Sequence, residues 1–190
     1  PEAFSREQME YARKRLHEIY ALQVEEIGGE ENLRLINDAN IVRSPLVYDE
    51  AFVAIAKHPT ALAVARACMG DKISLASQVG ILNKPGAKNY VENWHRELQY
   101  QHFTSSRPLA VQTLLTVDEF TKENGATFFL YGTHLFENFP SDDFVRKWQV
   151  QIEAPAGSLI MFDCLLYHRS APNRTDRERL AINNFYTLPI

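Results

Sequence analysis

The first seventy residues carry hydrophobic positions at helical spacing. The apolar residues that recur along the first stretch are Met9, Ala12, Leu16, Ile19 and Val24. Ser5 and Gln8 precede them with the spacing of a capping box, and Gly28-Gly29 ends the pattern. We therefore predict a first helix of about five turns.

Two further helical patterns follow. The stretch "PLVYDEAFVAIAKHP" (45–59) stops where His58 meets Pro59, because a proline lacks the backbone donor that a helix interior needs. The stretch "PTALAVARACMG" (59–70) begins on that proline and ends at Gly70. Residues 1–70 are therefore predicted to be helical.

After Gly70 the pattern changes to short runs rich in β-branched and aromatic residues. They cover residues 73–82, 91–98, 109–117, 126–132, 148–154, 158–163, 165–170 and 179–188. Turn signals such as Lys84-Pro85-Gly86 and Pro140-Ser141-Asp142 separate them. Evenly spaced short strands are typical of an antiparallel barrel or a double-sheet jelly roll, the architecture that includes cupins. We expect one domain over residues 1–190, mostly β, with a helical support region (1–70) packed outside the β core (71–190).

Composition narrows the range of partners. Twenty basic and twenty-four acidic residues give a net charge of −4, and no basic run is present, so we expect no nucleic-acid partner. No apolar run approaches the roughly 18 residues of a membrane span, and the first residues are charged instead of signal-like. Cys68 and Cys164 are too few to suggest a disulfide framework, so we expect a cytoplasmic setting. The oligomeric state is left open.

The stretch "NWHREL" (93–98) carries the first candidate chemistry. In an extended strand, residues two apart point to the same face, so His95 and Glu97 converge while Arg96 turns away. Such a pair fits two of the three ligands of a metal site. It equally fits an ordinary polar stretch at the edge of a sheet.

The third ligand of a mononuclear iron site would be a second histidine, since two histidines and one carboxylate leave the opposite face of the ion open. His168 is the best candidate, because it lies on a late apolar strand that a jelly roll can lay beside the strand of His95. Arg179 follows eleven residues later, and its planar guanidinium suits a ligand carboxylate. Taken alone, a late histidine with a nearby arginine also fits a surface pair or a satisfied core pair.

Five stretches in order resemble the phytanoyl-CoA dioxygenase family of iron- and 2-oxoglutarate-dependent oxygenases. They are "HPTALAVARACMGDKISL", "NKPG" with "WHREL", "TKENGATFFLYGTH", "APAGSLIMFD" and "YHRSAPNRTDRERLAINNFY", within about residues 58–188. The resemblance implies a double-stranded β-helix in which His95, Glu97 and His168 bind Fe(II). It also implies that Arg179 grips the far carboxylate of 2-oxoglutarate, with help from Ser170.

This chain departs from the family pattern at two points. Glu97 stands where the family usually has aspartate; halogenating relatives have a small residue there, so Glu97 favours oxygenation. The chain is also shorter than most members, so we expect the usual lid over the substrate to be short, disordered or missing from it. Lys84 and Gln112 are further candidates to face the pocket, although either equally fits a solvated strand end. His134 is expected to have a structural role or to support the site, instead of binding the metal.

The implied function is oxidation of a C–H bond of a small molecule by O2, by hydroxylation or desaturation, with release of succinate and CO2. Two alternatives stay open: a cupin-like metalloenzyme that does not use 2-oxoglutarate, and a barrel that binds a ligand without catalysis. Arg179 and Ser170 favour the 2-oxoglutarate enzyme. Similar proteins act on acyl-CoA, amino acids, sugars and natural products, so the sequence does not select a substrate.

Overall fold

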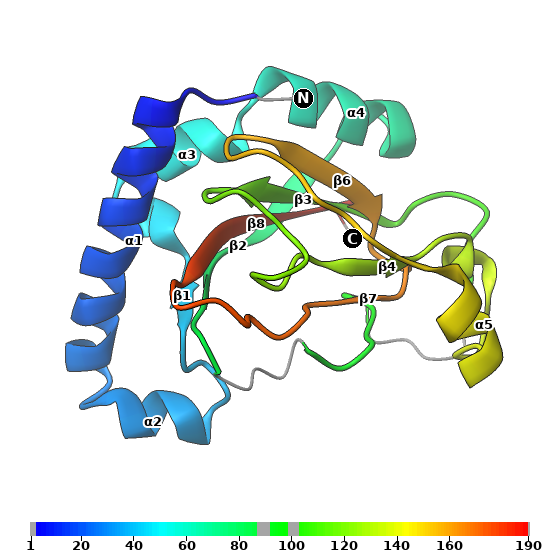
Figure 1. The fold of residues 1–190 in the computed structure, drawn as a ribbon. Coiled ribbons are helices and arrows are strands. Elements are labelled where there is room, and N and C mark those ends of the chain that lie inside the picture. Colours follow the sequence, from blue (N-terminus) through cyan, green and yellow to red (C-terminus); the bar gives the residue numbers. More distant parts are fainter. Residues whose placement is uncertain (1–2, 87–91, 99–102, 190) are drawn as a thin grey trace.

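Two antiparallel sheets form the centre of the computed structural model, which describes residues 3–86, 92–98 and 103–189 (Figure 1). The larger sheet has the order β1 (Ile41–Arg43), β2 (Ser74–Asn83), β8 (Arg179–Thr187), β3 (Ala110–Thr116), β6 (Leu159–Asp163). The smaller sheet has the order β5 (Gln149–Gln151), β4 (Phe128–Leu130), β7 (His168–Arg169). The expected β fold with N-terminal helices is confirmed at this level.

Helices cover the outer face of the larger sheet (Figure 1). They are α1 (Arg6–Glu26), α2 (Glu30–Leu35), α3 (Glu50–Ala56) and α4 (Pro59–Met69). Leu16 and Ile19 of α1 pack with Leu180 and Ile182 of β8 in one core cluster. Gly80 of β2 makes room for this contact, since a Cβ there would lie 2.5 Å from the Leu16 side chain.

Alternation along β8 divides the core between two layers. Leu180 and Ile182 face the helices, whereas Ala181 faces the smaller sheet and packs in a second cluster with Phe129 and Phe162. Arg179 has the same parity as Ala181 and therefore faces the space between the sheets. This strand lies between β2 and β3, so its inward residues stand at the middle of the larger sheet.

The first helix is confirmed together with its cap. Ser5 accepts from the backbone of Gln8, whose side chain in turn accepts from the Ser5 backbone. The helix predicted at 45–59 is shorter than expected, because a 3₁₀ turn (Pro45–Val47) precedes it and Asp49 caps α3. The sequence patterns did not predict α2, β1 or α5 (Asp142–Trp148), which begins where only a turn was expected.

The strand predicted at 91–98 is the largest difference among the expected strands. Val91 lies outside the described residues, and residues 92–98 contain a single isolated bridge, between His95 and His168. Beyond it, the Glu97 amide donates to the carbonyl of Cys164 and not to a neighbouring strand. The segment is therefore tied to its neighbours at a few points instead of along a ladder.

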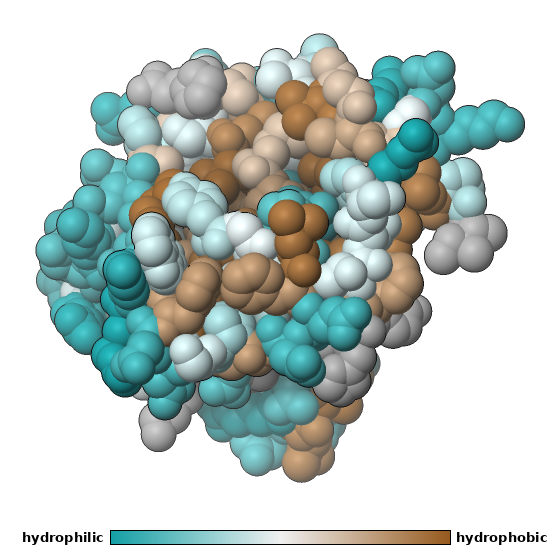
Figure 2. Space-filling model, turned by 90° about the vertical axis from the view of Figure 1, so that its right-hand side faces the viewer, coloured by the Kyte–Doolittle hydropathy of each residue, from teal (hydrophilic) through white to brown (hydrophobic). Residues whose placement is uncertain are grey.

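Aromatic contacts hold α5 against the turn that follows β4. Phe136, next to the 3₁₀ turn Thr133–Leu135, packs on Phe144, with ring centroids 5.4 Å apart. On the side that carries α5, hydrophobic side chains gather near the middle of the surface (Figure 2). Exposed large residues in this part of the chain are Tyr131, Leu135, Phe136, Phe139 and Trp148. No helix in the described part of the chain has the length and apolar character needed to cross a membrane.

Candidate metal centre

Three ligand side chains converge between the two sheets. His95 and His168 are joined by a pair of backbone hydrogen bonds, each 3.1 Å long, which set their rings side by side. Glu97 Oε1 lies 3.5 Å from His168 Nε2 and 3.9 Å from His95 Nε2. One ligand atom from each of the three residues lies within 4.8 Å of the others. The structure thus brings together the three residues that the sequence patterns selected.

Both imidazoles are oriented by backbone carbonyls. His95 Nδ1 lies 2.7 Å from the carbonyl oxygen of Asn93, and His168 Nδ1 lies 2.9 Å from that of Leu166. A carbonyl oxygen only accepts, so each Nδ1 carries the hydrogen. The Nε2 lone pairs are therefore turned toward Glu97, as metal ligation requires.

The charges at this cluster suit a divalent cation. Burial on its own would raise the pKa of Glu97, but the contacts with His168 and Gln112 outweigh it and lower the pKa to about 2. Burial, followed by the neighbouring His168, lowers the pKa of His95. The cluster therefore offers a carboxylate and a neutral imidazole at neutral pH, which are ligands that a divalent cation can use. Two imidazoles and one carboxylate are a donor set for Fe(II).

The cluster opens on a cavity of about 110 Å³ between the sheets. Arg179, Ser170 and Gln112 line the same cavity. Lys84 is not among its lining residues; the Lys84 ammonium lies 5.3 Å from the centre of the Tyr20 ring. His134 lines a separate hollow beside Phe129 and is not part of the cluster of His95, Glu97 and His168.

Arg179 is a buried cation whose hydrogen-bonding capacity is largely unused. Its side chain is 2% exposed, and Nη2 lies 3.4 Å from Ser170 Oγ. Nε and Nη1 have no hydrogen-bond partner among the described residues. The guanidinium lies 4.0 Å from the centre of the Phe120 ring, and burial lowers its pKa to about 10 despite the nearby Asp118. Such a group is costly to bury unless an anion binds it.

Arg96 turns away from the cluster as predicted, but its burial was not expected. The residue is 1% exposed, and its guanidinium lies 4.2 Å from the centre of the Tyr167 ring. It donates to the carbonyls of Thr133 and Phe136 on the turn after β4. An isolated arginine in a polar stretch gives no sequence signal for this role.

Asn183 and Arg43 are among the lining residues that the sequence patterns did not identify. Asn183 stands on β8 four residues beyond Arg179, so both point into the cavity, and strict alternation along the strand would have identified it. Arg43 lies at the cavity wall on β1, where Asp38 accepts from its Nε at 2.9 Å. The short strand β1 gave no pattern from which Arg43 could be found.

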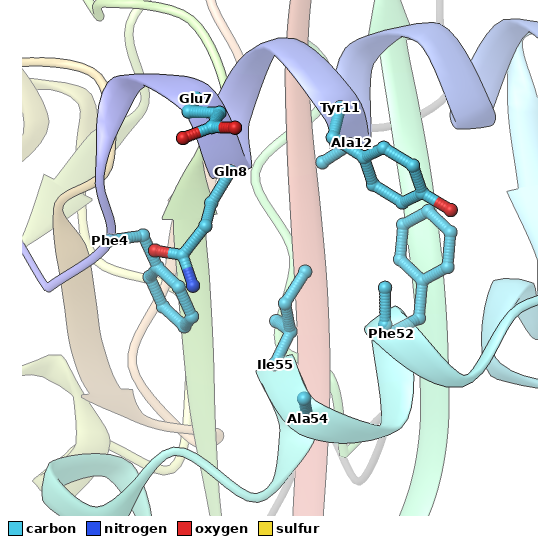
Figure 3. Close-up of a pocket in the computed structure, with 9 residues that line it drawn as sticks. Phe4, Glu7, Gln8, Tyr11, Ala12, Phe52, Ala54 and Ile55 are labelled. Carbon is cyan, nitrogen blue, oxygen red and sulfur yellow. The ribbon is translucent and has the colours of Figure 1, made fainter.

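A second cavity, of about 380 Å³, lies between α1 and α3 and offers little chemistry (Figure 3). Phe4, Phe52 and Ile55 face it. Two of its polar side chains are engaged elsewhere: Gln8 caps the helix, and the Tyr11 hydroxyl donates to Asp49 at 2.8 Å. The cavity between the sheets is therefore the candidate functional site.

Comparison with known proteins identifies the family and the fold of the chain. The sequence model of the phytanoyl-CoA dioxygenase (PhyH) family matches residues 1–181. The chain is 25% identical over 178 residues to the uncharacterized protein Rv1501 of Mycobacterium tuberculosis, covering 92% of this chain and 65% of that protein. It is 28% identical over 201 residues to dioxygenase af480 of Aspergillus fumigatus, covering 100% of this chain and 62% of that one. The chain therefore spans less than two thirds of the length of these relatives.

Solved structures share the fold. The non-heme monooxygenase ThoJ superposes with a TM-score of 0.78 at 18% identity, over 99% of this chain and 72% of that one. EctD from S. alaskensis, solved with 2-oxoglutarate and 5-hydroxyectoine, gives a TM-score of 0.77 at 21% identity, over 97% of this chain and 69% of that one. At these sequence identities, the structural similarity shows that the chain shares the fold of these two proteins.

Proposed function

Because the chain belongs to the phytanoyl-CoA dioxygenase family, we propose that it is an Fe(II)- and 2-oxoglutarate-dependent oxygenase acting on a C–H bond of a small organic molecule, with O2 as oxidant. Hydroxylation, with succinate and CO2 as coproducts, is the proposed outcome. His95, Glu97 and His168 would hold the iron. Their Nε2 and Oε1 atoms face one another, and the donor set is the one found in non-heme iron oxygenases.

The observation that supports 2-oxoglutarate as the cosubstrate is the guanidinium of Arg179, whose hydrogen-bonding capacity is largely unused. It opens on the same cavity as the metal cluster, and two of its nitrogens lack partners in the described part of the chain. A dicarboxylate with a keto group beside one carboxylate can reach a metal with one end and this arginine with the other. The epimerase SnoN, of similar fold, was solved with Fe3+ and alpha ketoglutarate. Ser170, 3.4 Å from Arg179 Nη2, would bind the same carboxylate.

Bound iron and 2-oxoglutarate would supply the oxidising chemistry. This chain's residues would orient and shield the reacting groups. The carbonyls of Asn93 and Leu166 keep the Nε2 atoms of His95 and His168 turned inward. The remaining wall, which includes Asn183, is free to contact the substrate.

The finer architecture is part of the same proposal. We propose that the two sheets are the halves of a double-stranded β-helix and that residues 1–190 form one domain. Residues 1–70 would serve as the helical support and 71–190 as the β core. The core cluster shared by α1, β2 and β8 supports this arrangement, because residues of the helices and of the larger sheet pack in it together.

Anaerobic titration tests the proposal. Adding 2-oxoglutarate to the Fe(II)-loaded protein should produce the visible absorption band of the metal chelate, and admitting air should yield succinate. His95→Ala and His168→Ala should each weaken Fe(II) binding by more than the roughly 10–100-fold typical of losing a supporting residue. Glu97→Asp should still bind the metal, whereas Glu97→Ala should not.

His134→Ala is the matched control, because this histidine lies outside the cluster. It should leave Fe(II) affinity unchanged. Metal binding without 2-oxoglutarate binding would support a cupin-like metalloenzyme instead. Absence of metal binding would support a non-catalytic barrel.

A further inference from the structure

The amide of Gln112 contacts the only carboxylate of the proposed metal site. Gln112 Nε2 donates to Glu97 Oε1 at 3.0 Å. The same oxygen is the one that lies 3.5 Å from His168 Nε2 and 3.9 Å from His95 Nε2. Since a carboxylate oxygen has two lone pairs, it can accept from Gln112 and still bind a metal. Gln112 thus holds the atom that faces both histidines.

The two partners differ in how firmly the fold holds their backbones. Gln112 lies on β3, paired with Phe162 of β6 on one side and with Phe185 of β8 on the other, and is 1% exposed. Glu97 lies in the segment whose cross-strand pairing is a single bridge at His95. A glutamate also has one more rotatable bond than an aspartate. The amide of Gln112, held by two neighbouring strands, therefore fixes the carboxylate of Glu97, whose own segment has little cross-strand pairing.

The orientation of the Gln112 amide follows from the charge of its partner. Two oxygens cannot face each other, so the NH2 group must point to Glu97 and Oε1 must point away. That Oε1 is buried and has no hydrogen-bond partner in the described ranges. An unpaired buried acceptor costs stability, so the amide is poorly explained as a stabilising element of the core.

We propose that Gln112 is a positioning residue: its amide holds the Glu97 carboxylate toward the two histidines, so that the metal meets an oriented set of ligands. This inference rests on the proposed function, since it assigns a role within the same site. Gln112 was expected as a candidate to face the pocket, and the positioning role is added to its place in the cavity wall.

The test is metal affinity, independent of turnover. Gln112→Leu keeps the size of the side chain but removes the donor. Co(II), followed by its visible absorption, should bind this variant about 10–100-fold more weakly than wild type. Gln78→Leu is the control: Gln78 is also 1% exposed but lies on the outer face of β2, where it donates to the Phe52 carbonyl and to Asn184. Its Co(II) affinity should equal that of wild type.

A second arm separates positioning from general damage. The carboxylate of Glu97→Asp is one methylene shorter and lies farther from Gln112, so adding Gln112→Leu to this variant should change Co(II) affinity less than threefold. Thermal unfolding of each metal-free protein checks that it is folded. If Gln112→Leu does not fold, Gln112→Asn, whose shorter amide falls short of Glu97, takes its place with the same expected loss.

Two results would overturn the inference alone: wild type and Gln112→Leu bind Co(II) equally, or Gln112→Leu costs as much with Asp at position 97 as with Glu. If wild type does not bind Co(II), the proposed function and this inference fall together.

Discussion

At the scale of single residues, Arg179 decides between a 2-oxoglutarate enzyme and any other metal barrel. Breaking a buried charged pair by removing one partner typically costs about 3–5 kcal/mol, which is roughly two to four orders of magnitude in affinity. Arg179→Ala should weaken 2-oxoglutarate binding on that scale and leave Fe(II) affinity nearly unchanged. Arg179→Lys should recover part of the loss, because an ammonium keeps the charge but not the fork. Anaerobic titration of the chelate band measures both.

A companion variant separates ligand binding from folding. In the ligand-free protein Arg179 is a buried cation with two unpaired nitrogens, so replacing it with a linear apolar side chain removes a desolvation cost. Arg179→Met should therefore melt no lower than wild type while failing to bind 2-oxoglutarate. A variant that binds 2-oxoglutarate as tightly as wild type would contradict the assigned role.

His95 gives the metal-free protein a pH dependence of stability. Its pKa is lowered in the folded state, first by burial and then by His168. The unfolded chain therefore binds more protons between that lowered pKa and about 6.5, and stability is lost as the pH falls through this window. Urea unfolding at pH 7.5 and 5.5 should show this loss in wild type, and a smaller loss in His95→Gln. Equal losses in both proteins would show that His95 does not contribute.

At the scale of elements, Arg96 joins the ligand segment to the turn after β4. Its guanidinium donates to the Thr133 and Phe136 carbonyls from a fully buried position. Each buried group left unpaired costs about 1–3 kcal/mol, so Arg96→Leu should lower the free energy of unfolding by on the order of 3 kcal/mol. Arg96→Lys should recover little, because an ammonium cannot bridge both carbonyls and stack on Tyr167.

Urea unfolding of the metal-free variants measures the effect of Arg96. Arg107→Leu is the control, since Arg107 is exposed and should change stability by less than about 0.5 kcal/mol. Because Arg96 lies between His95 and Glu97 in the chain, its loss should also weaken metal binding. Wild-type stability in Arg96→Leu would mean that the contacts to the turn are dispensable.

Local sequence patterns predicted some features of these elements but not others. Period-two alternation placed His95 and Glu97 on one face and Arg96 on the other, because this geometry is local. It did not predict the extent of pairing, since the single bridge at His95 depends on a two-residue strand from elsewhere in the chain. The short elements α2 and β1 were missed for the same reason: three to six residues carry too little periodicity, and tertiary contacts define them.

At the scale of the whole molecule, the turn at Gly125 connects the two halves of the site. Gly125 has φ +85°, and a Cβ there would lie 2.3 Å from the Ala171 carbonyl oxygen and 2.7 Å from Asn83 Nδ2. Ala171 lies on the connection from His168 to Arg179, and Asn83 Nδ2 donates to its carbonyl at 3.3 Å. The close approach of the Gly125 and Ala171 backbones therefore helps to place Ser170 and Arg179 relative to the proposed metal site.

Gly125→Ala should accordingly be disruptive. A left-handed backbone costs a non-glycine residue about 1–3 kcal/mol, and the clash with Ala171 adds to this. Gly132→Ala measures the backbone cost alone. Gly132 has φ +82°, and a Cβ built there would meet nothing within 4 Å. Gly125→Ala should lose more stability than Gly132→Ala in urea unfolding, and should bind 2-oxoglutarate more weakly. Equal losses would mean that the packing against Ala171 is loose.

The overall arrangement of the strands could be anticipated only in part. Strand spacing predicted antiparallel sheets, and the order of motifs predicted that His168 would meet His95. The sheet order β1-β2-β8-β3-β6 was beyond the sequence, because it depends on which strands pair across the core and not on any local pattern. The burial of Arg179 without a carboxylate partner within ion-pairing distance, in the described part of the chain, likewise emerged only from the packing of both sheets.

The central position of β8 has a consequence for how the chain is made. Its four companions in the larger sheet precede it in the sequence, and β8 fills the gap between β2 and β3. A growing polypeptide therefore exposes two open strand edges on the ribosome until β8 emerges, and such edges invite pairing with other chains. Arg179 lies on that strand, so a growing chain carries the three proposed metal ligands before it carries the residue proposed to bind the cosubstrate.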